Sequence, residues 1–351
     1  MTRLIINARF LTQPITGVQR YAIEISRQIK IIDPNTVFVS PPGILHESIA
    51  DELDVKIVGK LKGHLWEQIE LPLYLIRQPY SPLLLNLANT APLYYKNKII
   101  QVHDISFKRF PKSFSWKFRR AYGYAIPRIL KNSKLIITDS EFSREEIISF
   151  YKTPKDKVRI IHCATSSMFS PNKKTKTDSY ILAVSSLSFQ KNFHSLIKAF
   201  NDLKDKSIKL RLVGSINKNF ADHQLLKDMD NNDNIEFVGR VDDITLRDLY
   251  SNAICFVYPS LYEGFGIPPI EAQACGCPCI VSNVSSLPEV CGDSVLYFNP
   301  NDISDITRKI EALISSPTMQ ADLISKGYDN ILRFSWEKSA FNLLELVKHT
   351  K

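Results

Sequence analysis

Residues 255–283 read CFVYPSLYEGFGIPPIEAQACGCPCIVSN and contain the signals of a strand, a loop, a helix and a second strand. CFVYPS and CPCIVS are short, almost continuously apolar runs, which is typical of strands buried on both faces. The segment IPPIEAQACG between them opens with prolines, which the first turn of a helix tolerates. A strand, a crossover helix and a second strand predict one unit of a parallel sheet.

The same alternation recurs along the whole chain. Strand-like runs in the first half are RLIINA, NTVFVS, PLLLNLA, KIIQVHD, KLIITDS and VRIIHCA, and those in the second half are YILAVSS, KLRLVG, NIEFVG, CFVYPS, CPCIVS and SVLYFNP. Helical patterns such as NFHSLIKAFNDL and DDITLRDLYSNA separate them, with apolar residues three and four positions apart. This pattern predicts an α/β fold with two Rossmann-like, doubly wound parallel sheets.

The chain has 351 residues, which suits two domains. The polar segment MFSPNKKTKTDS is the best linker candidate. We therefore expect one domain over residues 1–168 and a second over residues 169–335. A C-terminal helix over 336–351 is able to pack back on the first domain.

Six cysteines include the group Cys275-Gly-Cys277-Pro-Cys279. Its spacing matches no usual zinc pattern, so we interpret these thiols as reduced, buried side chains in a cytoplasmic setting, with a metal site as the alternative. No apolar run reaches ~18 residues, so no transmembrane helix is expected. The first residues, MTRLIINARF, start as a strand and lack the features of a signal peptide.

Positive charge is concentrated in the first half of the chain. Residues 1–160 carry 25 Lys and Arg against 14 Asp and Glu, whereas residues 161–351 carry 20 against 22. The segment FKRFPKSFSWKFRRAYGY interleaves basic and aromatic residues. Such a segment suits an anionic membrane surface or a phosphate-bearing ligand; nucleic acid and a merely solvated basic face are the alternatives.

The loop EGFG follows one of the predicted strands and precedes a helix, where ligands of open parallel sheets bind. Gly264 and Gly266 allow close approach of the backbone, and free N–H groups at a helix start attract phosphate. The carboxylates of Glu263 and Glu271 accept hydrogen bonds from paired hydroxyls. Together these features fit a nucleotide sugar, although a helix cap and a solvent-exposed glutamate are the alternative interpretation.

The string EGFGIPPIEAQACGCPCIVSN resembles the signature of the retaining glycosyltransferases of family 4, whose GT-B fold places two Rossmann-like domains across a cleft. The resemblance implies that Glu263 contacts the donor sugar and that Glu271 binds the ribose hydroxyls. It also implies donor contacts from the backbone of the segment between them, namely Gly264, Phe265, Gly266 and Ile267.

Other segments resemble the same family. AVSSLSFQKNFHSLIKAF implies that Lys191 clamps the diphosphate and that Ser186 is among the donor-binding residues, although Ser186 and Gln190 stand where many members have arginine. NIEFVGRVDD implies that the backbone at Arg240 and Val241 reads the base. The remaining assignments by resemblance are Gly17 for the donor, Arg20 and Asp104 for the acceptor, and His103 near the transferring sugar.

The segment after His103 resembles bacterial mannosyl- and rhamnosyltransferases of surface polysaccharide synthesis. The resemblance implies a saccharide acceptor, and we expect one carried on a polyprenyl diphosphate at the inner membrane face, with Lys108 and Arg109 among its contacts. GDP-mannose is the favoured donor, with dTDP-rhamnose and UDP-sugars as alternatives. No nucleic acid is expected as a partner.

We expect no metal and no other cofactor. The letters DMD at residues 228–230 match an Asp-x-Asp metal motif, but they lie in a polar turn after a helix rather than at a strand end. Lys191, helix N-termini and backbone N–H groups would then neutralise the leaving diphosphate. By resemblance, substitution occurs on the front face without a protein nucleophile, and His103 positions the sugar rather than acting as an essential base.

Three other functions compete with this interpretation. A nicotinamide-dependent oxidoreductase needs Gly-x-Gly-x-x-Gly after its first strand, and neither NARFLTQPITGVQ nor AVSSLSFQKN contains it. A non-catalytic nucleotide-sugar-binding protein is the second. An epimerase or phosphorylase of the same fold is the third.

Overall fold

The computed structural model describes residues 4–172, 179–215 and 232–350. The chain forms two compact units, which are described separately. Unit 1 comprises Met1–Ile105, Trp116–Cys163 and Ser335–Lys351, and unit 2 comprises Ser106–Ser115 and Ala164–Phe334. Within the described residues, no helix is both long enough and apolar enough to cross a membrane.

Unit 1 is built on a parallel sheet whose described strands lie in the order β3-β2-β1-β4-β5-β6-β7. The strands are β1 (Leu4–Asn7), β2 (Val37–Ser40), β3 (Lys56–Ile57), β4 (Leu83–Asn86), β5 (Lys98–Gln101), β6 (Leu135–Thr138) and β7 (Val158–Ile160). The order reverses between β1 and β4, which makes this pair the topological switch point of the sheet.

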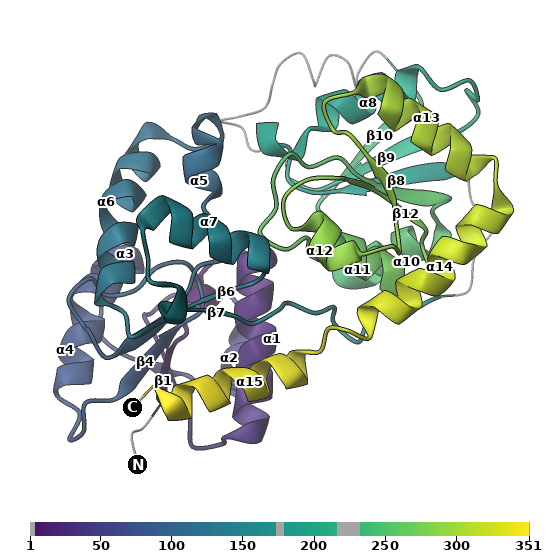
Figure 1. Cartoon of the computed structure of the whole chain (residues 1–351). Coiled ribbons are helices and arrows are strands. Elements are labelled where there is room, and N and C mark those ends of the chain that lie inside the picture. The colour runs from purple at the N-terminus through teal and green to yellow at the C-terminus, as the bar shows by residue number, and fades with distance from the viewer. Residues whose placement is uncertain (1–3, 173–178, 216–231, 351) are drawn as a thin grey trace. The chain divides into compact units, whose positions relative to one another are not determined.

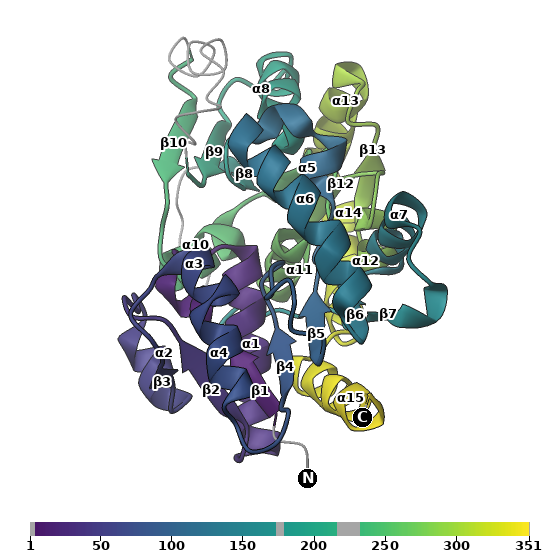
Figure 2. The ribbon, with the colours of Figure 1, turned by 90° about the vertical axis from the view of Figure 1, so that its left-hand side faces the viewer.

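Helices cover both faces of this sheet. They are η1 (Arg9–Thr12), α1 (Gly17–Ile32), α2 (Glu47–Glu52), α3 (Gly63–Gln68), α4 (Glu70–Ile76), α6 (Trp116–Asn132), α7 (Glu141–Tyr151), η3 (Lys155–Lys157) and α15 (Trp336–His349). α3, α4 and α6 lie on one face, and α1 and α15 on the other (Figure 1, Figure 2).

The C-terminal helix α15 packs against α1. The ring of Trp336 meets that of Tyr21 edge to face, with centroids 5.7 Å apart. Ser339 Oγ donates a hydrogen bond of 2.8 Å to the carbonyl of His162. The last helix of the sequence is therefore part of unit 1.

Unit 2 contains the second parallel sheet, with described strands in the order β10-β9-β8-β11-β12-β13. They are β8 (Tyr180–Val184), β9 (Lys209–Val213), β10 (Ile235–Gly239), β11 (Cys255–Tyr258), β12 (Cys279–Ser282) and β13 (Leu296–Phe298). The helices are α5 (Ser106–Arg109), η2 (Pro111–Ser113), η4 (Phe189–Lys191), α8 (Phe193–Asn201), α10 (Asp243–Asn252), α11 (Ile267–Ala274), α12 (Leu287–Cys291), α13 (Ile303–Ile314) and α14 (Pro317–Ile331).

The predicted α/β class with two parallel sheets is confirmed, and each of the twelve apolar runs contains a strand. The runs predicted these strands because their residues are buried: β1, β2, β4 to β6, β11 and β12 are buried at every position. The prediction missed β3, whose residues Lys56 and Ile57 are both exposed and therefore produce no apolar run.

One segment departs from the predicted division of the chain. Residues 106–115 were assigned to the first domain, but in the structure they pack with unit 2. The ring of Phe110 lies 5.8 Å from that of Tyr262, and η2 packs against η4. These contacts join residues far apart in the sequence, so composition around the segment did not indicate them.

Candidate active site

The candidate donor site lies at the switch point of unit 2, where the strand order reverses between β8 and β11. The loop after β8 leads to Lys191, and the loop after β11 leads to Glu263. The backbone N–H of Leu261 donates a 2.8 Å hydrogen bond to the carbonyl of Gln190 and so ties the two loops together. Ligands of open α/β sheets bind at this position.

Lys191 and Glu263 form an ion pair at the centre of this site. The distance from Lys191 Nζ to Glu263 Oε1 is 2.6 Å, and the two side chains are 15% and 11% exposed. The same oxygen accepts a 2.7 Å hydrogen bond from the hydroxyl of Tyr258. Hydrogen bonds among the described residues leave Glu263 Oε2 and two N–H groups of Lys191 unused, so both groups can bind a ligand.

Two serines hold the loop that carries Glu263. The backbone N–H of Glu263 donates to Ser285 Oγ at 2.9 Å. Ser286 Oγ donates to the carbonyls of Glu263 and Phe265 at 3.0 and 2.9 Å. The loop is therefore fixed by α12 and the turn before it, which is the kind of support that a binding site needs.

Glu271 is the fifth residue of α11, just beyond the first turn of that helix. It is 4% exposed and accepts a 3.3 Å hydrogen bond from the hydroxyl of Tyr250. Burial, followed by the charge of Glu271, raises the pKa of Tyr250 well above its ordinary value. The tyrosine thus remains a hydrogen-bond donor to the carboxylate.

The start of α11 supplies fewer donors than the sequence analysis expected. Pro268 and Pro269 occupy the second and third helical positions and carry no N–H. Anion binding at this helix therefore depends on the loop backbone and on Ile267. Gly266 has φ of +100°, and a Cβ there would lie 2.6 Å from a methyl group of Leu287, so only glycine fits.

The other predicted donor residues of unit 2 also lie at the carboxyl edge of its sheet. The exposed Ser186 is in the loop after β8, Arg240 and Val241 follow β10, and Gly264 and Phe265 are buried in the loop after β11. Lys191 ends η4, two residues before α8 begins. The structure thus places the predicted donor residues of unit 2 along one sheet edge.

His103 follows β5 in unit 1 and is held by groups on both sides of its ring. Its Nδ1 lies 2.7 Å from Asp139 Oδ2, and its Nε2 lies 3.2 Å from the carbonyl of Leu87. Burial alone would lower the pKa of His103, but the Asp139 carboxylate and the Leu87 carbonyl raise it above the ordinary value. Both ring nitrogens face hydrogen-bond acceptors, and this arrangement favours the doubly protonated ring over a ring with a free lone pair.

The remaining predicted residues are divided between the two units. Gly17 is the first residue of α1; a Cβ there would meet nothing within 4 Å, so the position is open. Arg20 lies one turn further along α1, and Asp104 follows His103 in unit 1. Lys108 and Arg109 end α5 in unit 2, rather than in the first domain as predicted.

Several functional neighbours were missed by the sequence analysis. Tyr250 and Tyr258 hold the two glutamates, Ser285 and Ser286 hold the loop, and Asp139 holds His103. Asp139 directly follows a predicted strand and Tyr258 ends one. Their positions at strand ends could have marked both as candidate site residues.

All six cysteines are buried and outside any disulfide, in line with their predicted structural role. Burial raises the pKa of Cys255, Cys275 and Cys291 to about 12, so these thiols stay protonated. Among the described residues, no group of three or more His, Cys, Asp or Glu side chains could hold a metal ion. The DMD letters at 228–230 lie outside the described residues.

Comparison with known proteins places this site in a family. Residues 165–330 match the family model of glycosyl transferases group 1. This part of the chain is a group 1 glycosyltransferase domain. It contains the ion pair of Lys191 and Glu263 as well as Glu271.

The relatives of this glycosyltransferase match it over almost its full length. It is 28% identical to O-antigen chain mannosyltransferase B of Escherichia coli, over 95% of this chain and 96% of that protein. It is also 28% identical to O-antigen chain mannosyltransferase RfbU of Salmonella typhimurium, with the same coverage. The chain is therefore a glycosyltransferase, an enzyme that takes a nucleotide-sugar donor and a saccharide acceptor.

A solved structure supports the fold. Alr3699/HepE of Anabaena, crystallised with UDP and glucose, matches 99% of this chain with a TM-score of 0.80 and 16% identity, and 100% of that chain is covered. This likeness confirms the predicted GT-B class, in which two Rossmann-like units share one chain.

Proposed function

We propose that this glycosyltransferase transfers a mannosyl group from GDP-mannose to a saccharide acceptor during bacterial surface polysaccharide synthesis. Two relatives that match 95% of the chain are named O-antigen chain mannosyltransferases, which supports both the sugar and the process. The ion pair of Lys191 and Glu263 at the switch point of unit 2 is the observation on which the proposal depends.

In this proposal the donor engages the ion pair of unit 2 directly. Lys191 turns its unused N–H groups toward the diphosphate, while Glu263 Oε2 accepts from hydroxyls of the mannosyl group. Glu271, held by Tyr250, accepts from the ribose hydroxyls. Ionised carboxylates suit paired hydroxyls because each oxygen accepts more than one hydrogen bond.

The reaction breaks the bond between the anomeric carbon and the diphosphate oxygen. The acceptor oxygen forms its bond to the same face of that carbon, and its proton passes to the leaving phosphate oxygen, which gives retention of configuration. Lys191 stabilises the negative charge that develops on the diphosphate. An acceptor lies opposite each ring nitrogen of His103, which supports a mechanism in which this histidine is not the base.

We further propose that the enzyme needs no metal and acts at the inner face of the cytoplasmic membrane, on a saccharide carried by polyprenyl diphosphate. The exposed basic side chains of α6 are Lys117, Arg119, Arg120, Arg128 and Lys131. They alternate with exposed Trp116 and Tyr124, and no acid occurs between residues 105 and 138. Basic and aromatic side chains on one helix favour an anionic lipid surface.

A screen of nucleotides tests the donor. GDP should raise the melting temperature of the protein more than UDP or dTDP does, and GDP-mannose hydrolysis should be measurable in the presence of EDTA. Stabilisation by UDP or dTDP alone would assign a different donor class. No stabilisation by any of the three would contradict the proposal.

A further inference from the structure

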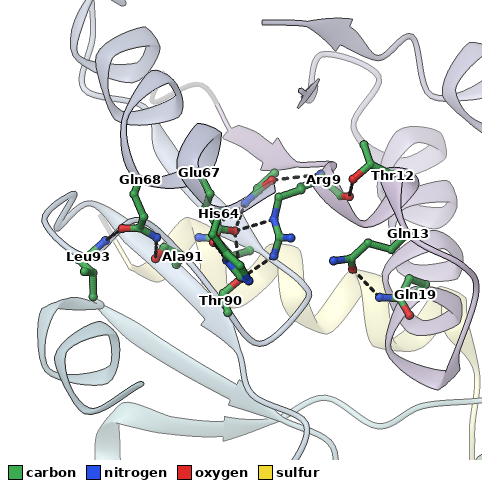
Figure 3. Close-up of polar contacts among 12 residues, drawn as sticks. Arg9, Thr12, Gln13, Gln19, His64, Glu67, Gln68, Thr90, Ala91 and Leu93 are labelled. Carbon is green, nitrogen blue, oxygen red and sulfur yellow. Dashed lines mark hydrogen bonds and ion pairs between the residues drawn. The ribbon is translucent and has the colours of Figure 1, made fainter. Parts of the chain in front are cut away.

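A cluster of buried polar side chains in unit 1 has no place in the predicted site. Asn7 ends β1 and Asn86 ends β4, and Asn7 Nδ2 donates to Asn86 Oδ1 at 3.1 Å. Arg9, in η1 after β1, donates from Nε to Glu67 Oε1 of α3 at 3.2 Å. Thr90, after β4, accepts from Arg9 Nη2 at 2.8 Å and donates to Glu67 Oε1 at 3.1 Å (Figure 3).

This cluster lies at the switch point of the unit 1 sheet. Asn7 and Asn86 end β1 and β4, the two strands between which the strand order reverses, and Arg9 and Thr90 follow those strands. The equivalent position of unit 2 carries Lys191 and Glu263. In open parallel sheets, this crevice beyond the strand ends is the usual ligand site.

The ion pair at the centre of the cluster is costly as a purely structural feature. The side chains of Arg9 and Glu67 are 6% and 1% exposed. Removing two charges from water costs several kcal/mol per ion, and an apolar pair of similar volume is often at least as stable. Stability alone is therefore a weak explanation for these charges.

Two donor groups at this cluster make no hydrogen bond among the described residues. Among the described residues, Arg9 uses its Nε and one Nη2 proton, and its Nη1 has no partner. Figure 3 shows the guanidinium of Arg9 and the side-chain amide of Gln13 pointing toward one another. Gln13 Oε1 accepts from Gln19 Nε2 at 2.8 Å, whereas the described hydrogen bonds do not use Gln13 Nε2.

The charge balance and the rim of the cluster favour a neutral polyol. Glu67 offsets the charge of Arg9, so the pair offers directed donors without a net positive charge to attract phosphate. His64, whose side chain is 54% exposed, contacts Glu67 and meets the ring of Tyr122 edge to face at 6.2 Å. Tyr122 stacks on Phe118 at 3.8 Å, which adds an aromatic surface beside the polar groups.

We propose that this cluster is the acceptor subsite of the enzyme. Arg9 Nη1 and Gln13 Nε2 donate to hydroxyl oxygens of the acceptor saccharide, and His64 forms the exposed rim. Glu67 is a positioning residue, since it holds Arg9, Thr90 and His64 at once. The assignment of this saccharide as the acceptor rests on the proposed glycosyl transfer.

Saturation-transfer NMR on the full chain with saturating GDP tests this subsite. The probes are the methyl glycosides of α-mannose, α-rhamnose, β-glucose and N-acetyl-β-glucosamine, with pyrophosphate as the anionic comparison. Arg9→Lys keeps the charge but loses the planar fork, and Gln13→Ala removes one donor without touching the ion pair. Arg27→Lys, in the exposed pair with Glu52, is the matched control.

At least one glycoside should bind to the wild type and to the control. Arg9→Lys and Gln13→Ala should each weaken its binding about tenfold, as expected for one lost hydrogen bond, while GDP affinity stays within twofold. His64→Gln removes the ring but keeps a side-chain donor for Glu67, so it should weaken glycoside binding with little change in the melting temperature.

Three results would overturn the subsite. They are no glycoside binding to a wild type that binds GDP, unchanged glycoside binding in both Arg9→Lys and Gln13→Ala, and Arg9-dependent binding of pyrophosphate in place of glycosides. A negative nucleotide screen, in contrast, contradicts the proposed donor chemistry of unit 2. Glycoside binding therefore tests the subsite, and the nucleotide screen tests the proposed function separately.

Discussion

Lys191 and Glu263 form a 2.6 Å ion pair that joins the loops on either side of the switch point in unit 2. The lysine follows β8 and the glutamate follows β11, so the two loops converge only because those strands are neighbours. In the absence of donor, each side chain satisfies part of the other's charge. In the mechanism that we propose, donor binding exchanges this contact for contacts with diphosphate and sugar.

Removing the amine should therefore affect turnover more than folding. Lys191→Ala should lower kcat roughly 10²- to 10³-fold, the effect of losing one preorganised charge at the leaving group. Steady-state kinetics with GDP-mannose measure it. Lys198→Ala, on the exposed face of α8, should retain wild-type turnover. Equal losses in both variants would show that Lys191 has no special role.

Glu271 should act on nucleotide affinity instead of on turnover. Glu271→Gln keeps the shape but removes the charge that accepts from ribose hydroxyls, so we expect the Kd for GDP to rise about tenfold, equivalent to about 1.4 kcal/mol. Calorimetric titration of GDP measures the change. Glu311→Gln, in α13, is the control. An unchanged Kd in Glu271→Gln would remove the ribose contact from the mechanism.

Replacement by alanine should change the free energy of unfolding much more at Gly266 than at Gly17. Gly266→Ala places a Cβ 2.6 Å from Leu287 at φ of +100°, so we expect it to destabilise the fold by about 1–3 kcal/mol. Gly17→Ala meets nothing within 4 Å, so stability should change by less than ~1 kcal/mol. Urea unfolding compares the two. Gly17→Ala should nonetheless lower activity if donor reaches that open position, and wild-type activity would argue that it does not.

Much of this site could be predicted because the signals are local. Strand burial identified the sheet edges, and the spacing of Glu263 and Glu271 around a glycine loop indicated a ligand. Contacts between distant segments could not be predicted in this way. Arg9 and Glu67 are 58 positions apart, and Asp139 is 36 positions from His103. Residues 106–115 were placed wrongly for the same reason, since Phe110 meets Tyr262 only in the folded unit.

His103 should make folding stability depend on pH. Asp139 raises the folded-state pKa of His103 above its unfolded value near 6.5, so this contribution is complete below about pH 6.5 and is lost as the pH rises through the folded pKa. His103→Asn keeps one amide donor but does not titrate. The free-energy difference between wild type and His103→Asn, from urea unfolding, should therefore be larger at pH 5.5 than at pH 9. A constant difference would mean that the ring is not charged in the fold.

The basic face of α6 should control binding to anionic lipid. Each exposed basic side chain near such a surface contributes about 1 kcal/mol, so replacing Lys117, Arg119 and Arg120 by serine should weaken binding to phosphatidylglycerol vesicles roughly 100-fold. Vesicle co-sedimentation at fixed salt measures this, and replacing the exposed Lys198, Lys204 and Lys206 of unit 2 is the charge-matched control. Because the effect is electrostatic, the difference between the two triple variants should shrink at high ionic strength. Equal binding by both at low salt would exclude α6 as the membrane-facing surface.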